Sequence, residues 1–138
     1  HGRCQTAATF EKKLEKLVTR ASSFAEFVFI DGPVELPLQH GERVNTRGWW
    51  TPGAAHRSAG DPVVRETLAR AWAELGPFDG VLGFSEGAAA AVAFCRIAAV
   101  ADPLGDQTGL GLRFAVLAGA PGPFSEDVGA QKLLLPSL

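Results

Sequence analysis

Hydrophobic positions recur at helical spacing in two stretches of the chain. Over residues 6–20, apolar side chains three or four positions apart share the segment with a charged face of lysines and glutamates. This pattern predicts an amphipathic helix. The second stretch starts at Asp61, an acid suited to cap a helix, and Pro62 fits the first helical position. Its apolar stripe continues until Gly76, so we expect a second helix over residues 61–75.

Short, uninterrupted apolar runs predict strands at residues 27–30, 81–84 and 113–118, and a leucine triplet at 133–135 predicts the start of another. Such runs are typical of parallel strands covered on both faces, because half-exposed strands alternate polar and apolar residues. An Ala-rich helix is expected over 86–100. Strands and helices therefore alternate, which predicts an α/β fold with a doubly wound, mostly parallel sheet.

Residues 32–60 lack a strong period and are rich in Gly, Pro and polar side chains, so we expect a long loop excursion there. Loops of this length in compact domains often form lids or pocket walls. Trp49 and Trp50 lie within it. Two interpretations stay open for this pair: the family resemblance described below implies that it walls the pocket, and the equally open alternative is that it covers the core beneath the loop.

Composition limits the classes of protein that the chain can represent. Its 138 residues fit one domain, and 46% hydrophobic with 20% charged residues excludes wholesale disorder. A formal charge of −2 gives no basic excess for nucleic acid or an anionic membrane surface. Two cysteines, Cys4 and Cys95, provide neither a disulfide framework nor a metal-type pair. We therefore expect no metal, no nucleic acid and no membrane partner.

The start of the chain is unusual, since it contains no methionine and opens on His1-Gly2. We interpret the sequence as incomplete at this end. It shows no signal peptide and no apolar run close to the roughly 20 residues that span a bilayer. A cytoplasmic location is the resulting expectation, and the oligomeric state stays open.

The strongest chemical signal is the sequence Gly83-Phe84-Ser85-Glu86-Gly87, which matches G-x-S-x-G between a predicted strand and a predicted helix. In a nucleophile elbow the chain turns sharply, the serine hydroxyl projects outward, and the glycines allow close packing. The helix N-terminus then offers N–H groups to a developing oxyanion. The alternatives are a turn that only packs, or one that holds a phosphate. The phosphate alternative is weakened because neither G-x-G-x-x-G nor G-x-x-x-x-G-K-[ST] occurs there.

Four segments in order resemble the motifs of the FSH-type serine hydrolases, a family of the α/β-hydrolase superfamily. They are His1–Gln5 (H-G-x-x-Q), Phe27–Pro33 (a strand ending in D-x-P), Arg47–Trp50 (R-x-W-W) and Gly76–Ala89 (G-P-F-D-G…G-F-S-Q-G-A-A). The resemblance runs along the full chain, and four ordered motifs are far more specific than one.

The resemblance implies roles for particular residues. Ser85 would be the nucleophile, the backbone N–H groups of Arg3 and Glu86 would form the oxyanion hole, and His1 would shape the loop without acting as a base. The family usually has Gln where this chain has Glu86. A carboxylate beside a developing oxyanion is unfavourable unless it points away or is paired.

The chain lacks one part of the expected machinery, because its three histidines all precede Ser85. In α/β-hydrolases the acid and the histidine follow the serine. The resemblance therefore implies a partial α/β-hydrolase fold that lacks its first strand or strands and its C-terminal acid and histidine segment. The missing strand would lead into His1-Gly2 and would lie in the sheet between the strands at 27–30 and 81–84. An isolated chain of this kind is expected to be marginally stable and catalytically poor.

We thus expect a serine hydrolase domain whose parent cleaves a small-molecule carboxylic ester or thioester through a Ser85 acyl-enzyme, with no cofactor. One alternative is a non-catalytic or truncated family member that acts by binding, which the missing histidine favours. Another is a nucleotide-binding α/β module, which the missing phosphate fingerprints disfavour.

Overall fold

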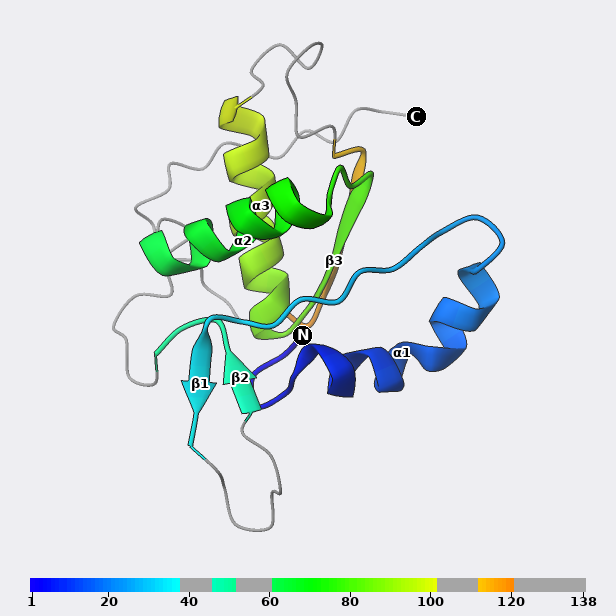
Figure 1. Cartoon of the computed structure of the whole chain (residues 1–138), viewed down its shortest axis with the longest axis horizontal. Helices are drawn as coiled ribbons and strands as arrows, with labels where there is room; N and C mark the ends of the chain where they lie inside the picture. The colour runs from blue at the N-terminus through cyan, green and yellow to red at the C-terminus, as the bar shows by residue number, and fades with distance from the viewer. Residues whose placement is uncertain (38–45, 52–60, 102–111, 121–138) are drawn as a thin grey trace.

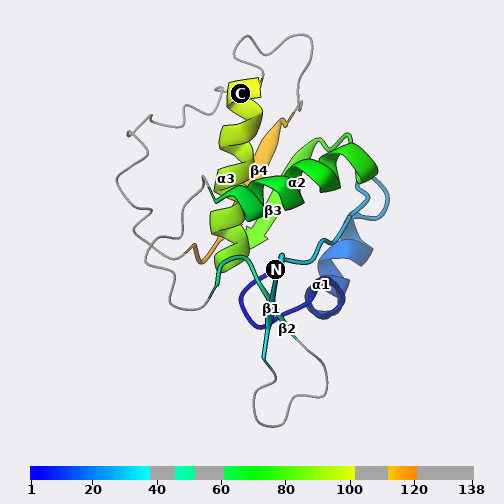
Figure 2. The ribbon, with the colours of Figure 1, turned by 60° about the vertical axis from the view of Figure 1, so that its left-hand side comes forward.

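The computed structural model describes residues 1–37, 46–51, 61–101 and 112–120. In chain order its elements are α1 (Ala7–Ala21), β1 (Val34–Leu36), β2 (Thr46–Gly48), α2 (Pro62–Leu75), β3 (Gly80–Phe84), α3 (Glu86–Ala101) and β4 (Phe114–Ala118). Helix α3 packs along β3 and β4, and α2 crosses α3 (Figures 1 and 2). The N-terminus lies beside the turn from β3 into α3 (Figure 1).

Strands β3 and β4 form a parallel pair, with Gly80 opposite Phe114 and Phe84 opposite Ala118. Parallel pairing of these two strands was expected from their apolar runs and from the helix between them. The mixture of helices and strands agrees with an α/β fold. That the complete sheet is doubly wound stays a prediction.

Two helices begin at capping side chains, of which the sequence predicts the one at Asp61. The Thr6 hydroxyl accepts a hydrogen bond from the Thr9 N–H at 3.1 Å at the start of α1. Asp61 Oδ1 accepts from the N–H groups of Val63 (2.9 Å) and Val64 (3.3 Å) at the start of α2. Each cap satisfies N–H groups that have no partner within their own helix.

Replacing Asp61 tests the cap of α2. Asp61→Ala removes the acceptor of two N–H groups, so we expect the free energy of unfolding to fall by about 1 kcal/mol. Asp61→Asn keeps a side-chain oxygen at the same place and should lose less than half of that. Urea denaturation of the three proteins measures the difference, and equal losses for both variants would contradict the capping role.

The core lies where α2 and α3 meet the segment around the two tryptophans. Its buried residues are Trp49, Trp50, Val64, Leu68, Ala89, Ala90 and Phe94. The first turns of α3 bury a run of alanines, whose small side chains let the helix backbone approach β3 closely. This close approach fixes the end of β3 relative to the start of α3.

One predicted strand is not formed. Residues 27–30 are outside regular secondary structure, and their backbone makes no ladder with another described strand. Phe29 instead packs edge-on against Phe10 of α1, with ring centroids 6.1 Å apart. The apolar run predicts a strand, but a strand also needs a hydrogen-bonded neighbour, which composition alone does not reveal.

The predicted loop over 32–60 contains regular structure. Strands β1 and β2 pair antiparallel, with Val34 opposite Gly48 and Leu36 opposite Thr46. Each strand has three residues, too few for an alternating pattern to stand out from the sequence. The leucine triplet at 133–135 lies outside the described residues.

Apolar side chains remain exposed on the β3–β4 pair. They are Phe84, Phe114, Val116 and Leu117, between 42% and 55% exposed. Exposed apolar surface on a sheet favours association. The marginal stability expected from the sequence stays a prediction.

Across the described part of the chain, none of the helices has the length and apolar character needed to cross a membrane.

Candidate active site

Ser85 is the single residue between the end of β3 and the start of α3. Its φ angle is 53°, in the left-handed region that costs a residue with a side chain about 1–2 kcal/mol. Its N–H donates to the Ala118 carbonyl at 2.8 Å, and its own carbonyl accepts from the Ala88 N–H at 2.9 Å. The sharp strand-to-helix turn expected at Ser85 is therefore present, and the residue is half-buried.

Two glycines make this turn possible. A Cβ on Gly83 would collide with the Gly87 carbonyl oxygen and would lie 2.6 Å from Ala88 Cα. A Cβ on Gly87 would collide with the His1 carbonyl oxygen and would lie 2.9 Å from the His1 nitrogen. Both positions thus need glycine because backbone approaches within the space of a methyl group.

The opening loop, residues 1–5, lies directly beside Ser85. A Cβ on Gly2 would be 3.3 Å from Ser85 Cβ, so the loop backbone and the serine are in contact. The Gly2 N–H donates to Gln5 Oε1 at 3.0 Å, and Cys4 turns the chain with a φ of 59°. The loop is therefore a tight turn closed by its own side chain.

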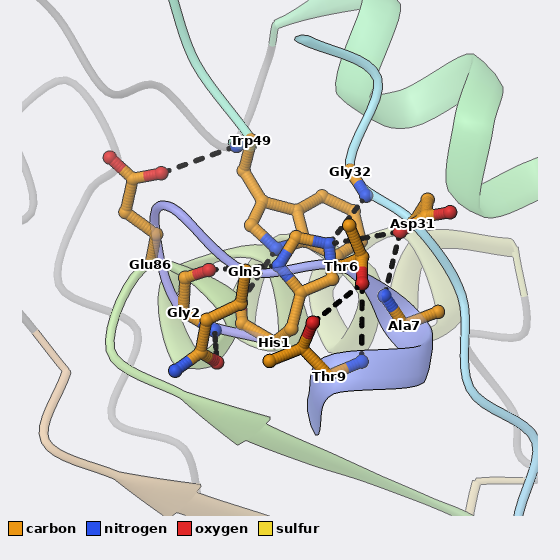
Figure 3. A network of polar contacts seen from close by, with 10 residues as sticks. All are labelled: His1, Gly2, Gln5, Thr6, Ala7, Thr9, Asp31, Gly32, Trp49 and Glu86. Carbon is orange, nitrogen blue, oxygen red and sulfur yellow. Dashed lines mark hydrogen bonds and ion pairs between the residues drawn. The ribbon is translucent and has the colours of Figure 1, made fainter. Parts of the chain in front are cut away.

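His1 holds this loop in place through both ring nitrogens (Figure 3). Nε2 accepts from the Gly32 N–H at 2.8 Å, and Nδ1 lies 2.8 Å from the Gly2 carbonyl oxygen. These partners fix a neutral ring with its proton on Nδ1, so the 3.8 Å approach of Asp31 Oδ1 is not an ion pair. The Trp49 indole N–H donates to the His1 carbonyl at 2.9 Å. His1 thus shapes the loop, as expected.

Arg3 and Glu86 belong to the two segments that adjoin Ser85, the opening loop and the start of α3. Arg3 follows Gly2 in the loop that touches Ser85, and its backbone N–H makes no hydrogen bond to any other described residue. Glu86 is the first residue of α3. The oxyanion-hole role expected for their N–H groups stays a prediction.

The Glu86 side chain is buried, with 2% of the residue exposed. Oε1 accepts from Arg3 Nη1 at 2.8 Å, and Oε2 accepts from the Trp49 backbone N–H at 3.2 Å (Figure 3 shows the second bond). The sequence left open whether this carboxylate points away or is paired, and the structure pairs it. Sequence reasoning missed the side chain of Arg3 as the partner.

The two tryptophans lie in the core. Trp49 is 3% and Trp50 is 1% exposed, and both pack in the cluster between α2 and α3. The open cavity of about 410 Å³ beside α2 has neither indole nor Ser85 in its lining. Their burial agrees with the interpretation that they cover the core, and the pocket-wall role stays a prediction.

The described residues hold no cluster of three or more His, Cys, Asp and Glu side chains that could bind a metal ion. Burial raises the pKa of the Cys95 thiol, which keeps it protonated and unreactive. His40, His56 and the acids after Glu86 lie outside the described residues.

Comparison with known proteins decides the family. The family model described as "Serine hydrolase (FSH1)" matches residues 1–136. The chain belongs to the FSH1 serine hydrolase family. This agrees with the four motifs read from the sequence. No solved structure matches the chain.

Curated relatives of this FSH1 family chain include proteins with esterase names. It is 31% identical over 160 residues to human "Esterase OVCA2", covering 97% of this chain and 69% of that protein. It is 30% identical over 122 residues to "Esterase OVCA2" of Xenopus tropicalis, covering 75% of this chain and 53% of that protein. A match to "Rhodanese-like domain-containing protein 6" of Arabidopsis thaliana, 32% identical over 126 residues, covers 69% of this chain and 21% of that protein. The chain thus spans only part of each of these relatives, about half of the Xenopus tropicalis protein and 69% of the human one.

Proposed function

We propose that this chain carries the nucleophile and the oxyanion hole of a serine hydrolase that cleaves small-molecule carboxylic esters or thioesters. The observation that carries the proposal is the left-handed φ of 53° at Ser85, directly between a strand and a helix. Backbone strain of this kind persists where surrounding structure enforces it, and it clusters at active sites. The esterase names of the relatives support the same reaction class.

The reaction would proceed by acyl transfer. Ser85 Oγ forms a bond to the acyl carbonyl carbon while a base takes its proton, and the carbonyl oxygen becomes an oxyanion. The N–H groups of Arg3 and Glu86 donate to that oxyanion, and the α3 N-terminus adds a partial positive charge. The alcohol or thiol then leaves with a proton, and water releases the acid from the acyl-enzyme.

The base of this reaction is not assigned. No histidine follows Ser85 in the 138 residues, and both ring nitrogens of His1 are engaged in the opening loop. A serine that lacks its base retains only the part of the rate enhancement that comes from the oxyanion hole and binding, roughly 10³–10⁴-fold over water.

Ester turnover tests the proposal. The gene product that contains residues 1–138 should release one equivalent of nitrophenol from p-nitrophenyl butyrate in a burst, followed by slower turnover, because the acyl-enzyme accumulates. A parallel assay with butyryl-thiocholine compares the thioester. A folded protein that turns over neither substrate and shows no burst would overturn the proposal and leave the binding-only alternative.

A further inference from the structure

The ion pair between Arg3 and Glu86 joins the two segments that offer N–H groups to the proposed oxyanion. Arg3 Nη1 lies 2.8 Å from Glu86 Oε1, and it also lies 3.4 Å from the Trp50 carbonyl oxygen. The two residues are 83 positions apart in the chain. The Glu86 side chain is 3% exposed and that of Arg3 is 30% exposed.

Burial of the Glu86 carboxylate creates an electrostatic difficulty that the Arg3 guanidinium relieves. A buried charge is costly unless it is paired and hydrogen-bonded. This carboxylate belongs to the residue next to Ser85, so an uncompensated negative charge would also oppose the negative charge that develops on the acyl oxygen. The guanidinium makes the pair neutral as a unit.

The second carboxylate oxygen adds a third segment to the link. Oε2 accepts from the Trp49 backbone N–H at 3.2 Å (Figure 3), and a Cβ on Gly48 would lie 3.4 Å from it. The carboxylate is therefore held against the backbone that follows β2. Through one side chain, the opening loop, the start of α3 and the Trp49 segment are tied together beside Ser85.

We propose that Arg3 is a positioning residue, whose guanidinium neutralises the Glu86 carboxylate and holds the opening loop against α3 so that both backbone N–H groups serve one oxyanion. This inference rests on the proposed function. It explains how this chain accommodates glutamate directly after the nucleophile, since the charge that glutamate brings is balanced by a cation from the facing loop.

The test measures the second-order rate constant with which a fluorophosphonate labels the gene product that contains residues 1–138. Arg3→Met keeps the backbone N–H and most of the side-chain length but removes the cation that lies 2.8 Å from Glu86 Oε1. We expect labelling to slow by about 10- to 100-fold, less than the ~10²–10³-fold typical of losing an oxyanion donor itself. Arg3→Lys keeps the charge and should lose less than about tenfold.

Removing both charges should restore the rate. The double variant Arg3→Met/Glu86→Gln removes both charges of the Arg3–Glu86 pair. Labelling should therefore return to within about fivefold of wild type, a non-additive result typical of paired residues. The matched control is Arg113→Met, which breaks an ion pair between Arg113 Nη1 and Asp79 Oδ1 at 3.7 Å. The two side chains are 79% and 78% exposed. It should label within about twofold of wild type.

The outcomes separate this inference from the proposed function. If Arg3→Met is labelled as fast as wild type, the positioning role alone is overturned. The same holds if the double variant is labelled as slowly as Arg3→Met. An unlabelled wild type would overturn the proposed function and this inference with it. If Arg3→Met does not fold, labelling of Arg3→Lys and of the double variant tests the positioning role instead. Labelling of a folded double variant that is more than about 100-fold slower than that of wild type would contradict charge compensation.

Discussion

Ser85→Ala is expected to abolish fluorophosphonate labelling of the gene product that contains this chain. Loss of the nucleophile in a serine hydrolase removes most of the rate enhancement, so labelling should fall by at least about 10³-fold. The substitution removes one oxygen from a half-buried residue. The fold should therefore survive, and circular dichroism should show unchanged helix content. In-gel fluorescence of the labelled proteins measures the effect.

Ser22→Ala is the matched control for this substitution. Ser22 is exposed at the end of α1, where its hydroxyl donates to the Thr19 carbonyl at 2.9 Å. Its loss should leave labelling unchanged, because the residue lies outside the elbow. Labelling that survives Ser85→Ala in a folded protein would mean that another residue reacts with the probe.

Gly83→Ala should produce the largest loss of stability among single methyl additions. The new Cβ would meet backbone atoms of Gly87 and Ala88, and backbone in the first turn of a helix moves less easily than a flexible side chain. We expect the free energy of unfolding to fall by about 3 kcal/mol, the upper end for overpacking. Because the clash lies within the elbow, labelling of Ser85 should also fall. Urea denaturation measures the first effect.

Gly119→Ala separates the clash from the general cost of replacing glycine. Gly119 has a φ of 60°, and its new Cβ would meet Phe84 at an ordinary 3.7 Å. Only backbone strain of about 1–2 kcal/mol is expected there. If Gly83→Ala proved no more destabilising than Gly119→Ala, the tight packing described for the elbow would be incorrect.

The elbow could be predicted because most of its determinants are local. The strand, Ser85, the two flanking glycines and the alanines of α3 occupy consecutive positions, and each favours the same sharp turn. The cap at Asp61 is local in the same way, since its partners are two and three residues away. Because these residues lie close together in the chain, the elbow and the cap could be predicted from the sequence.

What escaped prediction depends on partners that are distant in the chain. Residues 27–30 have the composition of a strand, but a strand forms only beside another strand, and none of the described strands pairs with them. The Arg3–Glu86 pair spans 83 positions. Its only signal was the presence of a charged residue at each of two positions, one of which usually holds Gln in the family that the chain resembles.

Identifying the residue that the probe modifies tests the central claim most directly. After fluorophosphonate treatment and proteolysis, tandem mass spectrometry should find the phosphonyl adduct on the hydroxyl of Ser85 and at no other serine. A folded, labelled protein that carries the adduct on a different residue, with Ser85 unmodified, would contradict the account.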